Sequence, residues 1–179
     1  MSDATDQVQA SADQAVAAQT RQVLAFLLNQ EEYAVPIEDV KEVIKIPQIT
    51  SVPGGREFIS GIINLRGKII PVLDIEKLFS LQRDSQTPTS HLLIVEDAHK
   101  ELFGIKVDEV EEVLKIAPDA IKPPPKMVAS KISAEYLEGV IILEAAQGDN
   151  SPERVLLLIN MQMIVTDKII ESLKEVVNL

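Results

Sequence analysis

The side chains of this chain that are able to carry out chemistry are few and poorly grouped. There are two histidines, His91 and His99, one on each side of a single apolar segment. Adjacent acids occur at 31–32, 96–97 and 111–112, whereas general acid–base catalysis needs groups that converge on a substrate. Adjacent acids at such places are typical of solvated strand ends and turns. We therefore predict that the protein is not an enzyme.

Motifs for bound metals and phosphates are absent from the sequence. The chain has no cysteine, so it can form neither thiolate ligands nor disulfides. It contains no HExxH motif, acidic calcium loop, GxxxxGK[ST] loop or GxSxG elbow. The pair Gly54-Gly55 is isolated and indicates a turn. We expect no metal and no cofactor.

The composition limits the partners that the chain can have. The net charge is −11 and the pI is near 4.6, which argues against binding nucleic acid or an anionic membrane surface. The apolar runs Val23–Leu28 and Val155–Ile159 are too short to span a bilayer. The first ten residues have neither the basic segment nor the apolar core of a secretory signal. A cytoplasmic protein without direct membrane insertion is expected.

An internal repeat organises the chain. Residues 32–46 (EYAVPIEDVKEVIKI, read from Glu32) align without a gap with residues 102–116 at an offset of 70. A second block, 58–75, resembles 136–144 followed by 154–161, so that Gly61 matches Gly139. The blocks have the same order in each half. The chain is therefore predicted to contain two copies of one small unit.

The expected elements are mostly short strands. Alternating or dense apolar segments separated by Pro, Gly and polar turns predict hairpins rather than a parallel sheet. Asp74 is predicted to cap a short helix at 75–81. Residues 1–20 are predicted to be a disordered tail, and a final helix is predicted at 167–177. The fold class is mainly β, with two small barrels.

The order of these motifs resembles the CheW family of bacterial chemotaxis coupling proteins. The shared run is EEYAVPIEDVKEVIKI, a proline–glycine loop, GIINLRGKIIPVLDI and then LFGIKVDEVEEVL, and the resemblance covers roughly residues 21–178. It implies a CheW-like domain over 21–179 with two intertwined SH3-like five-stranded β-barrels and a shared apolar groove. Subdomain 1 would occupy roughly 21–83 and subdomain 2 roughly 90–160.

The resemblance also implies a function. The chain would be a non-enzymatic adaptor that couples the cytoplasmic tips of methyl-accepting chemoreceptors to the regulatory domain of the histidine kinase CheA. It would then be recruited from the cytoplasm to membrane-associated receptor arrays. The diverged turn around Arg66 supports a contact there, because arginine is enriched among interface hot spots. Carried over residue by residue, the kinase-binding positions are Glu42, Gly61, Asn64 and Arg66.

The receptor-binding positions implied by the resemblance are Val35, Ile37, Val40 and Val110. Val40 and Val110 are equivalent in the repeat, so both either belong to the core or face a groove shared by the two halves. Glu42 has Lys41 and Lys45 nearby as ion-pair partners. Gly61 also fits a purely structural role, since Gly139 occupies the same place in the second copy.

Other functions stay open from the sequence. The chain would fit a regulatory or fused CheW-like module of another two-component pathway, such as pilus control. A duplicated barrel that binds or hydrolyses a small ligand is a further alternative, and it would need a closed pocket with converging polar groups.

Overall fold

The computed structural model describes residues 20–83, 88–129, 132–145, 152–166 and the positions 169, 171, 172, 174 and 175. The predicted disordered tail lies outside the described residues except for Thr20. The predicted helix at 167–177 also lies largely outside them. Within the described residues, no helix is both long enough and apolar enough to cross a membrane.

The described chain is built mainly from strands. These are β1 (Arg21–Leu28), β2 (Glu31–Pro36), β3 (Val40–Lys45), β4 (Ile59–Leu65), β5 (Lys68–Leu73), β6 (His91–Glu96), β7 (Leu102–Val107), β8 (Glu109–Ile116), β9 (Ile121–Lys122), β10 (Leu137–Leu143) and β11 (Arg154–Ile159). The short helices are η1 (Ile37–Asp39), α2 (Ile75–Leu78), η2 (Pro118–Ala120), α3 (Lys126–Ala129), η3 (Ala134–Tyr136) and α4 (Met161–Ile164). The predicted mainly β fold is confirmed.

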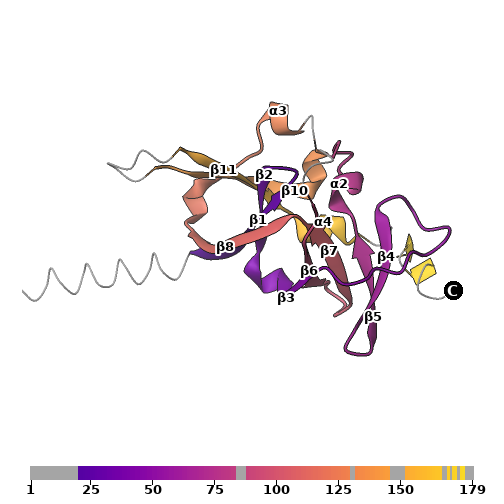
Figure 1. The fold of residues 1–179 in the computed structure, drawn as a ribbon. Helices are drawn as coiled ribbons and strands as arrows, with labels where there is room; N and C mark the ends of the chain where they lie inside the picture. The colour runs from indigo at the N-terminus through magenta and orange to yellow at the C-terminus, as the bar shows by residue number, and fades with distance from the viewer. Residues whose placement is uncertain are drawn as a thin grey trace, which may run out of the picture.

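The strands form two mixed sheets, which we call barrel 1 and barrel 2. Barrel 1 has the order β3-β6-β7-β5-β4, and barrel 2 has the order β8-β1-β2-β11-β10-β9. Figure 1 shows the two side by side, with hairpin β4–β5 at one end of the molecule and strands β8 and β11 at the other. Each barrel therefore takes one hairpin from the other half of the sequence: β1–β2 lies in barrel 2 and β6–β7 lies in barrel 1.

The internal repeat reappears as matched strand pairing. In barrel 1, β5 pairs in parallel with β7 through Val72 and Gly104. In barrel 2, β11 pairs in parallel with β2 through Leu158 and Ala34, which are the repeat equivalents of those two residues. The strand register thus confirms the duplication that the sequence predicts.

Three apolar clusters hold the structure together. One fills barrel 1 (Ile63, Ile70, Val72, Leu92, Ile94) and one fills barrel 2 (Val23, Ala25, Ala34, Ile116, Ile141, Leu156, Leu158). The third and largest takes buried side chains from both barrels and from α2 and α4, and we call it the central cluster. Because the central cluster joins the barrels, neither one buries its apolar surface alone.

Gly61 and Gly139 mark the place where each barrel folds back on itself. The chain that follows β3 pairs with β4 through an isolated bridge between Thr50 and Ile62. A Cβ on Gly61 would lie 2.2 Å from the carbonyl oxygen of Thr50, and the residue has φ +143°. A Cβ on Gly139 would lie 2.8 Å from the carbonyl oxygen of Lys122, in β9. Both glycines permit a close backbone approach, which supports the structural role that their repeat suggests.

Candidate protein-interaction site

The hairpin between β4 and β5 ends in a tight two-residue turn. Leu65 pairs with Lys68, and the two residues between them, Arg66 and Gly67, have φ values of +51° and +85°. Two successive positive φ values are typical of the type I′ turn that suits the twist of a hairpin. The side-chain oxygen Oδ1 of Asn64 accepts a hydrogen bond from the backbone N–H of Gly67 at 2.9 Å. Asn64 therefore fixes the turn that presents Arg66.

Arg66 reaches from this turn to Glu42 on β3. Its two terminal nitrogens donate to the two carboxylate oxygens of Glu42 at 2.7 and 2.9 Å. The hydrogen bonds from Arg66 lower the pKa of Glu42 below its ordinary value. Although it is held in this way, the Arg66 side chain remains 73% exposed. The two hydrogen bonds to Glu42 therefore fix the orientation of the guanidinium, while most of the side chain stays exposed to solvent.

The structure differs from the sequence analysis in the partner of Glu42. Lys41 bonds Glu96 instead, at 3.0 Å, because neighbouring residues on a strand point to opposite faces. Glu42, Asn64 and Arg66 are brought together in one site, which we call the barrel 1 ion-pair site. Gly61 lies on the same hairpin but is buried beneath Thr50, so it shapes the hairpin and offers no side chain to a partner.

The predicted receptor-binding positions lie between the barrels. Ile37, Val40 and Val110 are partly buried and pack at the edge of the central cluster. Val40 stands opposite Val95 on β6, and Val110 stands opposite Phe26 on β1, at equivalent places in the repeat. Val35 belongs to the central cluster itself and is 1% exposed. We call the first three, which are half-buried, the apolar rim, and Val35 is buried in the cluster on which they pack.

Barrel 2 carries an arginine site that the sequence analysis did not single out. Arg154, at the start of β11, bonds Glu32 on β2 at 2.9 Å and Glu112 on β8 at 2.8 Å. It also lies 3.4 Å from a carboxylate oxygen of Glu111. Glu112 is the repeat equivalent of Glu42, so each barrel binds this acid with an arginine from an equivalent hairpin, β4–β5 in barrel 1 and β10–β11 in barrel 2. The two arginines are not aligned in the internal repeat, so the sequence comparison of the two halves does not reveal that they bind equivalent acids.

A second cluster missed in the sequence is buried beneath the turn between β1 and β2. Arg83 bonds Glu76 at 2.5 Å and Asp108 at 2.8 Å, and both acids are buried. Asp108 also accepts a hydrogen bond from the backbone N–H of Asn29 at 2.7 Å. Burial raises the pKa of Glu76 against the opposing attraction of Arg83. These contacts tie the end of the first half to hairpin β1–β2 and to the junction between β7 and β8, which is a structural role.

The ionisable groups of the described residues do not assemble into a metal site, since no cluster of three or more His, Cys, Asp or Glu ligands occurs among them. Ser90 and His91 approach to 2.7 Å between Oγ and Nδ1. Ser90 also donates to the backbone oxygen of Asp108, so these three groups form one local hydrogen-bonded cluster.

Two barrels with exchanged hairpins, an oriented surface arginine and an apolar rim define a double-barrel scaffold suited to protein contacts. A family model described as the CheW-like domain matches residues 22–168. The chain therefore belongs to the CheW-like family, whose members serve as scaffold adaptors in chemotaxis, as the motif resemblance indicates.

Individual relatives agree with this assignment. The chain is 31% identical over 148 residues to the chemotaxis protein CheW of Klebsiella aerogenes, covering 83% of each chain. It is also 31% identical over 126 residues to the chemotaxis protein CheW of Treponema pallidum, covering 67% of this chain and 72% of that one. The crystal structure of the scaffolding protein TtCheW from Thermoanaerobacter tengcongensis matches with a TM-score of 0.68 at 34% identity, over 83% of this chain and 90% of that one.

Proposed function

We propose that the chain couples the cytoplasmic tips of methyl-accepting chemoreceptors to the regulatory domain of the histidine kinase CheA. The observation that carries the proposal is the barrel 1 ion-pair site, in which an exposed arginine is held by a turn and by a carboxylate. An arginine that is already oriented loses little side-chain entropy when a partner binds. The site is therefore suited to a surface that must bind a partner repeatedly.

The kinase contact is assigned to the hairpin end of barrel 1. Arg66 supplies the exposed cation, Glu42 and Asn64 hold it in place, and Gly61 allows the hairpin to pack under Thr50. Arginine is enriched among interface hot spots, which favours this end of barrel 1 as a contact surface.

The receptor contact is assigned to the apolar rim between the barrels. A receptor tip is a helical hairpin, and a helix can present apolar side chains at three- and four-residue spacing to such an apolar surface. Ile37, Val40 and Val110 are exposed enough to meet it, while Val35 keeps the floor rigid. The two assigned contacts involve different residues, so one adaptor can bind both partners together in a membrane-associated array.

Binding of the full chain to a purified CheA regulatory domain and to a receptor-tip fragment tests the proposal. We expect Arg66→Glu to weaken kinase binding about tenfold or more, which corresponds to about 1.4 kcal/mol, with the receptor affinity unchanged. Arg56→Glu, which places the same charge change on an exposed loop position, is the matched control and is expected to bind both partners normally. Kinase affinity that is equal for the Arg66 and Arg56 variants would remove Arg66 from the interface.

Two further variants test whether the kinase contacts Arg66 directly and whether the receptor contacts Val40. The exchanged pair Glu42→Arg with Arg66→Glu rebuilds the intramolecular ion pair with opposite polarity. Binding that stays weak in this double variant means that the partner contacts Arg66 itself, and recovery means that only the pair is needed. Val40→Asp is expected to weaken receptor binding, and an unchanged melting temperature is required before the loss is assigned to the contact, because Val40 packs on the central cluster.

A further inference from the structure

Strands β2 and β11 enclose an open pocket at one side of barrel 2. Their parallel pairing involves only Tyr33 with Leu157 and Ala34 with Leu158. Toward the start of both strands lies a cavity of about 500 Å³. It is lined by Gln30, Glu31, Glu32, Met127, Val128, Ile132, Val155 and Leu157. None of the residues assigned above to kinase or receptor contacts belongs to this lining.

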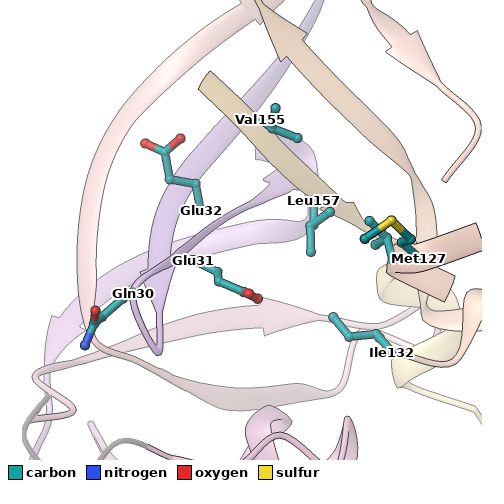
Figure 2. A pocket seen from close by; sticks show the side chains of 8 residues that line it. Gln30, Glu31, Glu32, Met127, Ile132, Val155 and Leu157 are labelled. Carbon is teal, nitrogen blue, oxygen red and sulfur yellow. The ribbon is translucent and has the colours of Figure 1, made fainter. Parts of the chain in front are cut away.

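The floor and one wall of this pocket are aliphatic. Figure 2 shows the side chains of Met127, Ile132 and Leu157 on one side, with Glu31 and Glu32 on the opposite side. Ile132 and Leu157 extend into the central cluster, so the floor is firmly supported. Met127 is 82% exposed at the mouth, and its unbranched side chain adapts to differently shaped partners. The pocket is therefore ready to receive an apolar side chain.

The opposite rim carries an excess of negative charge. Glu31 and Glu32 both line the pocket, and Glu32 shares Arg154 with Glu111 and Glu112 of β8, which lie outside the lining. The remaining potential at this rim is negative, and it favours a cation from a partner.

We propose that this pocket docks a cationic amphipathic helix of a protein partner. An aliphatic or aromatic side chain of the helix fills the space between Met127, Ile132 and Leu157. A lysine or arginine one turn away meets the two acids that line the pocket, Glu31 and Glu32. Complementary charge selects such a helix over an acidic one, which these carboxylates would repel. This contact is additional to the proposed receptor and kinase contacts.

Repeat symmetry supplies a matched pair of test variants. Val155 on the pocket lip and Ile69 in barrel 1 are both 49% exposed. They hold equivalent places in the repeat. Val155 pairs with Ile142, three residues after Gly139, and Ile69 pairs with Asn64, three residues after Gly61. Val155→Lys places a cation at the pocket, and Ile69→Lys makes a similar change at the other end of the molecule.

The probe is a fluorescein-labelled designed helix of leucine and lysine, titrated against the full chain by fluorescence anisotropy. Its acidic counterpart, with glutamate for lysine, and a scrambled lysine peptide without an apolar face are the reference probes. We expect Val155→Lys to weaken the leucine–lysine helix at least tenfold and Ile69→Lys to change it less than twofold. The acidic and scrambled probes are expected to bind at least tenfold more weakly than the leucine–lysine helix.

Methyl NMR of the same complex locates the probe. Chemical-shift changes centred on Met127, Val155 and Leu157 support the proposal. Equal losses in the two lysine variants, shifts centred elsewhere, or equal binding of the acidic or scrambled probe would overturn it. Because neither Arg66 nor Val40 lines the pocket, these outcomes are independent of the receptor and kinase assays.

Discussion

The close approach at Gly61 allows a quantitative prediction for Gly61→Ala. The residue has φ +143°, a region that side chains other than glycine reach at a cost of about 1–3 kcal/mol. The new Cβ would also lie 2.2 Å from the Thr50 carbonyl oxygen, so the backbone at Thr50 must move by about an ångström.

That movement weakens two further contacts. Thr50 and Ile62 exchange two backbone hydrogen bonds, each 2.9 Å long. A typical hydrogen bond contributes about 0.5–1.5 kcal/mol to stability. Strain and the two lost hydrogen bonds together predict a decrease of about 2–6 kcal/mol in the free energy of unfolding, a large part of the roughly 5–15 kcal/mol of an ordinary domain.

Urea unfolding followed by circular dichroism measures this decrease, with two other glycines as references. Gly54 has φ +80° but nothing within 4 Å of a new Cβ, so Gly54→Ala should cost only about 1–2 kcal/mol. Gly139 has a 2.8 Å approach without the positive φ, and Gly139→Ala should lie between the two. If Gly61→Ala and Gly54→Ala lost the same stability, the close approach would not be what requires glycine at this position.

Two predictions concern the pH dependence of single carboxyl groups. The hydrogen bonds from Arg66 lower the pKa of Glu42, so the pair contributes above the unfolded glutamate pKa of about 4.3 and its contribution is lost as the pH falls through the lower folded value. A carboxyl ¹³C titration should show a midpoint below that of an ordinary glutamate, and a midpoint unaltered by Arg66→Ala would contradict the assignment. Burial raises the pKa of Glu76, so its ionisation opposes folding and stability should decrease as the pH rises from about 4 through the higher folded value. Urea unfolding should show that Glu76→Gln lacks this component, whereas identical pH profiles for the variant and the parent protein would show that Glu76 titrates normally.

The strands and turns of this fold are predictable because they depend on local chemistry. Alternating apolar residues and short polar reversals predict hairpin β1–β2, and Asp74 does accept the capping hydrogen bond from the N–H of Lys77 that its position predicts. The exchange of hairpins between the barrels, in contrast, is not predictable from local sequence. Tyr33 and Phe103 occupy equivalent buried places, so either hairpin has the pattern needed for either barrel.

In the candidate site, too, local features are predictable from the sequence and long-range contacts are not. Asn64 and Arg66 are recognisable from the turn in which they lie, whereas the ion pair between Arg66 and Glu42 joins residues from separate strands. Proximity in sequence favours Lys41, but the strand pleat directs that side chain away. The barrel 2 pocket depends on where α3 and Ile132 lie against β11, and no local periodicity determines that position.

Exchange of the hairpins also has a consequence for how the protein is made. Strand β1 emerges first from the ribosome, yet Arg21 and Val23 pair with Ile116 and Leu114 of β8, which are synthesised much later. Barrel 1 likewise cannot be completed until β6 and β7 have been synthesised. Since no barrel is complete until most of the chain exists, folding is dominated by late, long-range contacts and should be slow for a protein of this size. The nascent apolar hairpin β1–β2 is left uncovered in that interval, which makes translation, rather than the finished scaffold, the stage most exposed to aggregation.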